Sequence, residues 1–376
     1  MNNKILLTTV YSGYNYGSCL QALASKLIIQ STGNECKLVK LKSLFRGRDI
    51  RLNKVLTIIW RSLLLANNKA IATYKESYKK HLSSDSKKLF DLFIYEFLTP
   101  EEVTLRQLKS MGKEALACFS GSDQIWNSSS LYVDPIYYLR FAPKEKRVAL
   151  APSFGRDFIA EYNIKKISHW INEYQFLSVR EDSGVELIKN LTGRTALHLL
   201  DPTLIIRHDE WIRILNINSK KKNKYILAYF LDEPSLAAKT MILQVKQHYE
   251  CDVIGIPYSF DNMNYCDYVL SAGPKEFVEL ISNAEFVLTD SFHGCAFSIN
   301  MHTPFYVFER EYKSANRQSE RVLSLLRKMD MLNRFQPSDM TDYSDINFNF
   351  SDKILNEERG KTYNFVKNAV SEISKK

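Results

Sequence analysis

Short apolar segments that end in a polar or glycine-containing turn, each followed by a helical stretch, recur along this chain and constrain its fold most. One series spans residues 5–10, 37–41, 115–119, 147–151, 176–179 and 197–200, and a second spans 225–230, 252–256, 286–288 and 305–308. Apolar runs of this length are typical of strands buried on both faces of a parallel sheet. Their alternation with helices predicts a doubly wound α/β fold.

The length of the chain and one polar run divide this series into two domains. A chain of 376 residues exceeds one ordinary domain. A lysine-rich run at residues 219–224 separates the two series of strands. We therefore predict a Rossmann-like domain over 1–215, a second over 222–350 and a C-terminal helix over 351–376. The two domains should face each other across a crevice, because open α/β sheets bind ligands at the carboxyl ends of their strands.

A helical insertion is predicted over residues 43–110 of the first domain. Its part at 43–90 is rich in Lys and Arg, with apolar residues at helical spacing. The favoured interpretation is a helix whose apolar face packs on the first domain. The alternative is a basic amphipathic helix that touches anionic lipid, which has the same pattern.

The net charge of +9 favours an anionic partner: a phosphorylated substrate, a nucleic acid or an anionic membrane surface. Nucleic acid is disfavoured, because no recognised binding module occurs. The six cysteines form no CxxC pair and show no Cys/His ligand spacing, and no apolar run is long enough to span a membrane. We therefore expect a cytoplasmic protein without disulfides or structural zinc, located at the inner face of the membrane if the basic helix touches lipid.

The stretch at residues 285–300 is the strongest candidate for a functional site. It predicts a buried strand, a tight turn and a helix that begins near His293. The helix N-terminus would offer unpaired N–H groups to an anion, and His293 would supply an acid/base group beside it. Gly294 would allow a ligand or another backbone to approach closely. The alternative is an ordinary strand–helix junction with an incidental histidine.

Six short motifs follow the predicted strands in order. They are NYG at 15–17, GSDQIWN at 121–127, APSFG at 151–155, SVREDSG at 178–184, DPTL at 201–204 and TDSFHG at 289–294. This set resembles the polysaccharide pyruvyl transferase family, over roughly residues 4–330. The resemblance implies a GT-B-like fold of two Rossmann-like domains. It also implies transfer of a pyruvyl group from phosphoenolpyruvate to two hydroxyls of one sugar, which forms a cyclic ketal and releases phosphate.

The family generally acts on cell-surface or exopolysaccharide sugars, often while these are attached to a carrier lipid. The implied partners are therefore phosphoenolpyruvate and a saccharide acceptor. No cofactor is expected, and the chemistry requires no metal. Two alternatives stay open. One is a GT-B-type nucleotide-sugar glycosyltransferase, which would release a nucleotide instead of phosphate. The other is a non-catalytic scaffold in a polysaccharide assembly complex.

Phosphoenolpyruvate carries a phosphate and a carboxylate, which need cations and N–H donors. The predicted donor-site residues are Arg180, Ser291, Gly294, Arg310 and Arg317. Arg180 lies in the SVREDSG motif, whereas Arg310 and Arg317 belong to a loop that also contains acids.

His293 is the predicted general acid, which would protonate the methylene carbon of the enol. Alternatively, His293 only binds the phosphate. Asp123 is the predicted base for the acceptor hydroxyl, with Asp290 as the second candidate. The predicted acceptor-site residues are Asn15, Gly17, Ser122, Gln124, Trp126 and Asn127. Trp126 would stack on a sugar ring, unless it is a buried aromatic of the loop.

Overall fold

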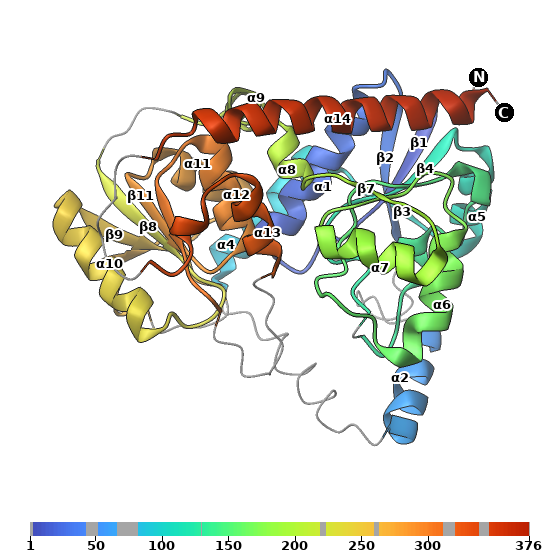
Figure 1. The fold of residues 1–376 in the computed structure, drawn as a ribbon, viewed down its shortest axis with the longest axis horizontal. Helices are drawn as coiled ribbons and strands as arrows, with labels where there is room; N and C mark the ends of the chain where they lie inside the picture. Colours follow the sequence, from blue (N-terminus) through green and yellow to red (C-terminus); the bar gives the residue numbers. More distant parts are fainter. Residues whose placement is uncertain are drawn as a thin grey trace.

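Two parallel sheets, each covered by helices, form the two halves of the protein (Figure 1). The computed structural model describes residues 3–42, 52–65, 82–128, 130–218, 223–258, 263–310, 320–337 and 346–375. The interior strands are almost entirely buried, as the apolar runs predicted: β1 buries Ile5 and Leu7, and β11 buries Val287 and Leu288. Burial on both faces of a strand is what a sheet between two helical layers requires.

The first sheet has the strand order β3-β2-β1-β4-β5, and all its neighbours are parallel. Its strands are β1 (Lys4–Thr8), β2 (Glu35–Leu41), β3 (Glu101–Val103), β4 (Ala117–Ser120) and β5 (Arg147–Ala149). Its helices are α1 (Tyr16–Gln30), α5 (Leu105–Glu114), α6 (Glu161–Asn172) and α7 (Asp182–Thr192). A separate pair, β6 (Ser178–Val179) and β7 (Leu197–His198), follows beyond β5 and is joined to it by a single bridge from Val148 to Phe176.

The second sheet repeats this order as β10-β9-β8-β11-β12, again with parallel neighbours. Its strands are β8 (Tyr225–Tyr229), β9 (Asp252–Gly255), β10 (Tyr268–Val269), β11 (Phe286–Thr289) and β12 (Phe305–Val307). Its helices are α10 (Leu236–Tyr249), α11 (Pro274–Asn283), α12 (Phe292–Met301) and α13 (Glu320–Lys328). The predicted α/β fold with two Rossmann-like, GT-B-like units is therefore confirmed. In each sheet the strand order reverses once, between β1 and β4 and between β8 and β11, and such switch points are where α/β sheets bind ligands.

The segment predicted as a helical insertion, 43–110, is only partly helical in its described residues. It contains α2 (Leu52–Leu65), α4 (Ser84–Phe93) and the π-helical turn Ile94–Leu98, but also the edge strand β3. Glu101 and Glu102 of β3 pair with Lys37 and Lys40 of β2, each at 2.9 Å. Charged edge strands are common in sheets, and their polar sequence hides them from an apolar-run search.

Helix α4 packs against the second half of the molecule. The Ala272 N–H donates to Ser86 Oγ at 3.1 Å, and the hydroxyls of Ser83 and Ser271 lie 2.7 Å apart. Phe90 and Phe93 of α4 are buried in the main core. This segment therefore joins the two halves and is not confined to the first domain.

Helix α2 contradicts the interpretation that its apolar face packs on the first domain. The contact with the body is polar: Arg61 donates to the Leu131 carbonyl and to Asn163 Oδ1, both at 2.8 Å. On α2, Leu56, Trp60 and Leu63 are instead exposed. Arg61, which is half-buried, has strong acceptors on α6 and the preceding loop, so this side chain ties the helix to the body. The neighbouring residues 43–51 and 66–81 lie outside the described part of the chain.

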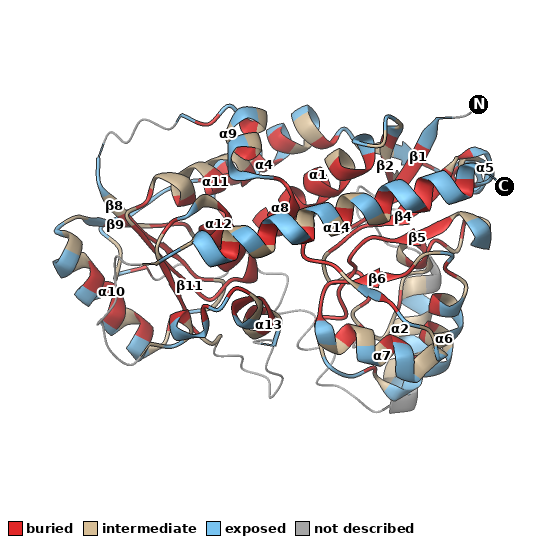
Figure 2. Cartoon of the chain, turned by 45° about the horizontal axis from the view of Figure 1, so that its top comes forward, coloured by how far each residue is buried: buried red, intermediate tan, exposed pale blue. Residues whose placement is uncertain are grey.

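The C-terminal helix α14 (Asn349–Ser374) runs across both halves and ends beside the N-terminus (Figures 1 and 2). Its inner side, including Leu355 and Val366, is buried. Arg359 of α14 donates to Asn300 Oδ1 of α12 at 2.9 Å and to the Leu204 carbonyl of the short helix α8 (Pro202–Ile205) at 3.2 Å. One side chain of α14 thus contacts elements from both halves. The sequence predicted this helix but not its crossing.

The remaining elements are short connecting helices. They are α8 (Pro202–Ile205), α9 (His208–Leu215) and the 3₁₀ turns Pro135–Tyr138, Lys144–Lys146 and Leu332–Arg334. Within the described ranges, every helix is too short or too polar to cross a lipid bilayer.

Candidate active site

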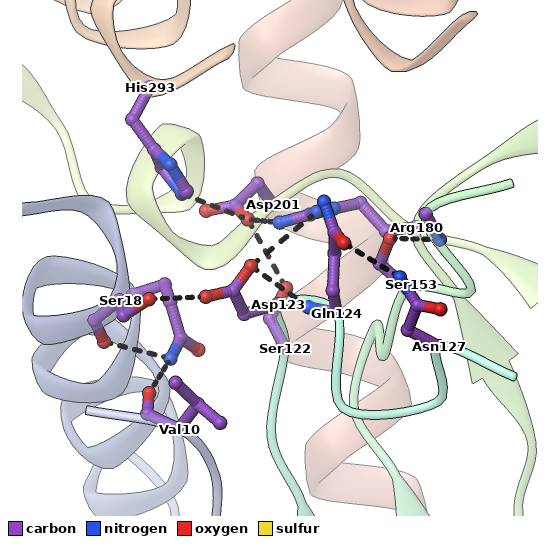
Figure 3. A network of polar contacts seen from close by, with 12 residues as sticks. Val10, Ser18, Ser122, Asp123, Gln124, Asn127, Ser153, Arg180, Asp201 and His293 are labelled. Carbon is purple, nitrogen blue, oxygen red and sulfur yellow. Dashed lines mark hydrogen bonds and ion pairs between the residues drawn. The ribbon is translucent and has the colours of Figure 1, made fainter. Parts of the chain in front are cut away.

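The two switch points meet where the first turn of α12 touches the first turn of α1 (Figure 3). His293, in α12, places its ring directly on Gly17, in α1. A Cβ atom built on Gly17 would lie only 1.9 Å from His293 Nδ1. Gly17 is therefore the residue that leaves room for the histidine. The ring is nearly buried, with 8% of the residue exposed.

The turn before His293 is held by its own side chains. Ser291 caps α12, because its Oγ accepts from the Gly294 N–H at 3.3 Å. Thr289 Oγ1 accepts from the Ser291 N–H at 3.0 Å and donates to the Tyr229 carbonyl at 2.6 Å. Gly294 is needed for this packing, since a Cβ there would lie 2.5 Å from Thr289 Oγ1. Ser291 and Gly294, predicted as donor ligands, are buried and instead shape the turn.

Asp201 is the carboxylate that contacts most of the polar side chains of the site. Its Oδ2 accepts from Arg180 Nη1 at 2.5 Å and from Ser122 Oγ at 3.2 Å, and it lies 3.8 Å from His293 Nε2. Its Oδ1 caps α8 by accepting from Thr203 N at 2.9 Å. Burial alone would raise the pKa of Asp201, but Arg180, His293 and the Thr203 N–H outweigh it and hold that pKa well below its usual range. Asp201 is thus a permanent anion.

Arg180 is buried among three carboxylates and one aromatic ring. Besides Asp201, its guanidinium lies 3.9 Å from Asp123 Oδ1 and 3.7 Å from Glu181 Oε1. Its Cζ lies 4.7 Å from the ring centroid of Phe292. Three buried N–H positions in this cluster, Nε and Nη2 of Arg180 and Nε2 of His293, have no hydrogen-bond partner among the described residues. A buried donor without a hydrogen bond destabilises the folded protein. A ligand with acceptor oxygens that bound here would supply the missing hydrogen bonds.

Asp123 lies on the other side of Arg180, at the carboxyl end of β4. Its backbone has a positive φ of 68°. Its carboxylate accepts from Ser18 Oγ at 2.5 Å and from its neighbour's N–H, on Gln124, at 2.8 Å. Burial alone would raise the pKa of Asp123. Arg180, His293 and these hydrogen bonds have the opposite and larger effect, so the pKa lies below its usual value. Asp123 is therefore ionised at neutral pH and is a weak proton acceptor.

Asp290 has the opposite electrostatic setting. Burial raises its pKa to about 6, although Arg310 and two backbone N–H donors act against the shift. These donors are Leu231 and Asp232, at 2.6 and 3.1 Å, so Asp290 fixes the loop after β8. Arg310 Nε lies 3.4 Å from the Asp290 carboxylate, so Arg310, a predicted donor ligand, is at least partly engaged in an ion pair. Arg317, another predicted ligand, lies outside the described residues.

The predicted acceptor residues separate into two groups. Gly17, Ser122 and Trp126 are buried. Trp126 is wholly enclosed, stacked on Tyr138 with ring centroids 5.5 Å apart, so the prediction that it stacks on a sugar is wrong. Trp126 belongs to the core of the first half, where its indole also contacts the rings of Phe154 and Tyr174.

Asn15, Gln124 and Asn127 are partly exposed. Asn15 caps α1 through Ser18 N at 3.0 Å and donates to Tyr258 Oη of the second half at 2.8 Å. The Gln124 amide lies 3.0 Å from Asn127 Nδ2, and with its oxygen turned toward α13 it accepts from Arg321 at 2.8 Å. Asn15 and Gln124 thus contact the second half of the molecule, and Asn127 contacts Gln124.

A cavity of about 320 Å³ opens beside this seam. Its charged lining residues are Arg156, Asp157, Glu181, Glu309, Glu320 and Arg321. Carboxylates outnumber cations here, so this cavity suits hydroxyl donors more than a second anion. Its volume falls within the usual range for small-molecule sites.

Sequence reasoning missed the roles of Asp201, Ser18 and Arg156, whereas it named Arg321 as a further candidate cation for phosphoenolpyruvate. Asp201 belongs to a recognised motif, but Asp before Pro reads as a helix cap, which it also is. Arg321 is the second residue of α13, and its local pattern does not show which surface it faces. Only the fold brings these residues to the switch points.

Gly17→Ala is expected to lower turnover about 100-fold, because the new methyl group must push the His293 ring from its place and small misplacements cost about that much. The matched control is Gly360→Ala in α14, where a Cβ meets no atom within 4 Å. That control should keep full activity and gain about 0.5–1 kcal/mol of unfolding free energy. Steady-state kinetics and urea unfolding of both variants measure this. Equal activity of the two variants would mean that the ring position is unimportant.

Comparison with known proteins bears on this site. A family model described as polysaccharide pyruvyl transferase matches residues 15–312, which contain all six motifs. A search of curated proteins finds no match.

Among solved structures, the chain is similar to UDP-N-acetylglucosamine 2-epimerase from Rickettsia bellii, with 10% identity, 98% of this chain and 97% of that chain covered, and a TM-score of 0.47. It is also similar to UDP-GlcNAc 2-epimerase from Methanocaldococcus jannaschii (12%, 94% and 98%, TM-score 0.45) and to a heptosyltransferase from E. coli (10%, 86% and 99%, TM-score 0.37).

Proposed function

The chain belongs to the polysaccharide pyruvyl transferase family and is a transferase, and from this we propose that it moves the pyruvyl group of phosphoenolpyruvate onto two hydroxyls of one sugar. The acceptor would be a saccharide precursor of a cell-surface polysaccharide or exopolysaccharide. The products would be a cyclic pyruvate ketal and inorganic phosphate. The observation that supports this best is that two buried cationic side chains, Arg180 and His293, approach the same carboxylate, Asp201, from two sides (Figure 3), while Nε and Nη2 of Arg180 and Nε2 of His293 make no hydrogen bond with the described residues.

Phosphoenolpyruvate would bind to those donors. Its carboxylate and its phosphate each offer two or more oxygens as hydrogen-bond acceptors. The Nε–Nη2 edge of a guanidinium can donate two parallel hydrogen bonds to such a group. On Arg180 these two nitrogens make no hydrogen bond with the described residues, although they lie 3.7 Å from Glu181 and 3.9 Å from Asp123, whereas Nη1 is bound to Asp201. Asp201 would thus orient the arginine, and the arginine would orient the donor. Phe292, stacked under the guanidinium, limits the directions in which it can turn.

His293 would act as the general acid. Its imidazolium Nε2–H would protonate the methylene carbon, C3, and the electron pair of the C2–C3 double bond would form the new C–H bond. The resulting cation at C2 is attacked by one sugar hydroxyl, which loses its proton to a base. Phosphate then leaves from C2, and the second hydroxyl of the sugar attacks there and closes the ketal. In balance, one hydroxyl proton ends on the new methyl group and the other on phosphate.

The attacking sugar hydroxyls need a base that accepts their protons. Asp123 was our first candidate, but its lowered pKa makes it a poor proton acceptor, and it is better suited to stabilise the cation at C2. Neutral His293, formed by the first step, would itself be able to take the hydroxyl proton. The cavity lined by Glu181 and Arg321 is the proposed place for the acceptor sugar, since carboxylates accept from sugar hydroxyls.

The experiment is phosphate release from phosphoenolpyruvate with a panel of galactose, mannose, glucose and N-acetylmannosamine glycosides. We expect release only with an acceptor, and a product whose mass equals that of the acceptor plus phosphoenolpyruvate minus phosphoric acid. Donor binding is measured in parallel by thermal shift at millimolar phosphoenolpyruvate, with UDP as the comparison ligand. Stabilisation by UDP and none by phosphoenolpyruvate would overturn this proposal in favour of a nucleotide-sugar glycosyltransferase.

A further inference from the structure

The outward face of α2 is an apolar surface that the proposed chemistry leaves unused. At about 100° per residue, its exposed side chains fall within one arc of about 140°. They are Val55, Leu56, Ile59, Trp60 and Leu63, which are 36%, 54%, 52%, 62% and 77% exposed. No charged residue lies within this arc. Contiguous apolar surface of this kind marks an interaction site.

The helix is held so that this face points away from the body. On its opposite side, Arg61 donates to the Leu131 carbonyl and to Asn163 Oδ1, and its guanidinium lies 5.3 Å from the ring centroid of Tyr162. Figure 1 shows α2 at an outer end of the first half, below α6. The body beside it is also partly apolar at its surface, with Phe158 and Ile164 each at least 40% exposed. The contacts of Arg61 thus fix the rotation of α2 so that its apolar side chains face away from the body.

The charge of the stretch of sequence that contains α2 indicates the partner. Residues 43–81 contain nine Lys and Arg residues against two acidic ones, a net +7 of the chain's +9. An apolar face that docks another protein does not require so much positive charge in the same segment, whereas attraction to an anionic membrane does. An apolar arc with a tryptophan, within a strongly basic segment, is the composition of helices that lie in the interface of an anionic bilayer.

We propose that α2 is a membrane-docking helix, which inserts Leu56, Trp60 and Leu63 among the headgroups of an anionic lipid surface. Burial of apolar side chains in the lipid interface and attraction of basic residues to anionic headgroups both favour such docking. The docking requires no bound substrate, so it stands apart from the proposed pyruvyl transfer.

The test is sedimentation of the full chain with phosphatidylcholine vesicles, with and without about one third phosphatidylglycerol. We expect at least tenfold tighter binding to the anionic vesicles, weakened by salt. Trp60→Ser/Leu63→Ser should reduce that binding at least tenfold. The matched control, Leu236→Ser/Leu243→Ser, removes two exposed leucines from α10 and should bind as the wild type does.

Tryptophan emission supplies a second readout. Trp60 is 62% exposed, whereas Trp126 and Trp211 are fully buried. Its emission should shift to shorter wavelength with anionic vesicles, and Trp60→Phe should abolish the shift while vesicle binding persists. Equal vesicle binding by the wild type and the α2 double variant would overturn the proposal. Absence of vesicle binding by the wild type would also overturn it. If the wild type were then a dimer that the α2 double variant converts to a monomer, the face would bind a second copy of the chain and not a membrane.

Discussion

Replacing His293 by alanine is expected to reduce acceptor-dependent phosphate release about 10²- to 10⁴-fold, the usual contribution of a positioned proton donor. The reason is geometric. The ring sits against Gly17 and 3.8 Å from Asp201, with Nε2 unpaired among the described groups. If His293 is the acid, kcat falls and the Kd for phosphoenolpyruvate changes little. Steady-state kinetics with a donor-binding titration measure both quantities.

The same pair of measurements separates the acid role from simple phosphate binding. If His293 only binds phosphate, the variant should lose donor affinity and regain rate at saturating phosphoenolpyruvate. His169→Ala is the matched control, because that side chain is 65% exposed on α6. It should leave kcat and donor affinity unchanged. A His293→Ala enzyme with both values intact would remove the histidine from the site altogether.

The positions of the strands were predictable because burial on both faces demands uninterrupted apolar sequence. Residues 286–288 have no polar atom in their side chains, and they form most of β11. The turns after these strands were also predictable, since the residues needed at strand ends are small or polar. His293 could be singled out for this reason: it lies two residues after the cap, in the first turn of a helix made mostly of apolar and small residues.

What the sequence could not provide is distance between segments. Asp201 and Arg180 form the centre of the site, and they lie 21 residues apart in separate motifs that each have a local explanation. Trp126 looked like a sugar platform because it stands among polar loop residues, but apolar residues from elsewhere in the fold enclose it. β10 escaped notice because both of its residues are exposed.

Helix α2 shows a second limit of sequence reasoning. An amphipathic pattern tells which side chains share a face, but not what that face meets. Packing on the domain was the favoured interpretation, since most such helices do this. The direction was decided by Arg61, whose acceptors lie on α6 and the loop before it, far along the chain.

Arg180→Met is expected to lower the free energy of unfolding at pH 7 by about 3–5 kcal/mol, because it leaves the buried carboxylate of Asp201 without its cation. The double variant Arg180→Met/Asp201→Asn, which removes both charges, should recover most of this loss but no activity. Urea unfolding and phosphate release measure the two effects. A double variant as unstable as the single one would show that the loss comes from packing against Phe292 and not from charge.

The same loss should depend on pH in a defined direction. In the wild type the pKa of Asp201 lies below its unfolded value, so its ion pair stabilises the fold above about pH 4 and this stabilisation fades as the pH falls toward the folded pKa. In Arg180→Met the buried carboxylate prefers its proton, so the cost is greatest at neutral pH and shrinks on acidification. We therefore expect the difference in unfolding free energy between wild type and variant to be smaller at about pH 4 than at pH 7. A difference that is constant across this range would mean that Arg180 stabilises the fold through its shape, and that the charge pairing of Asp201 matters only for binding the donor.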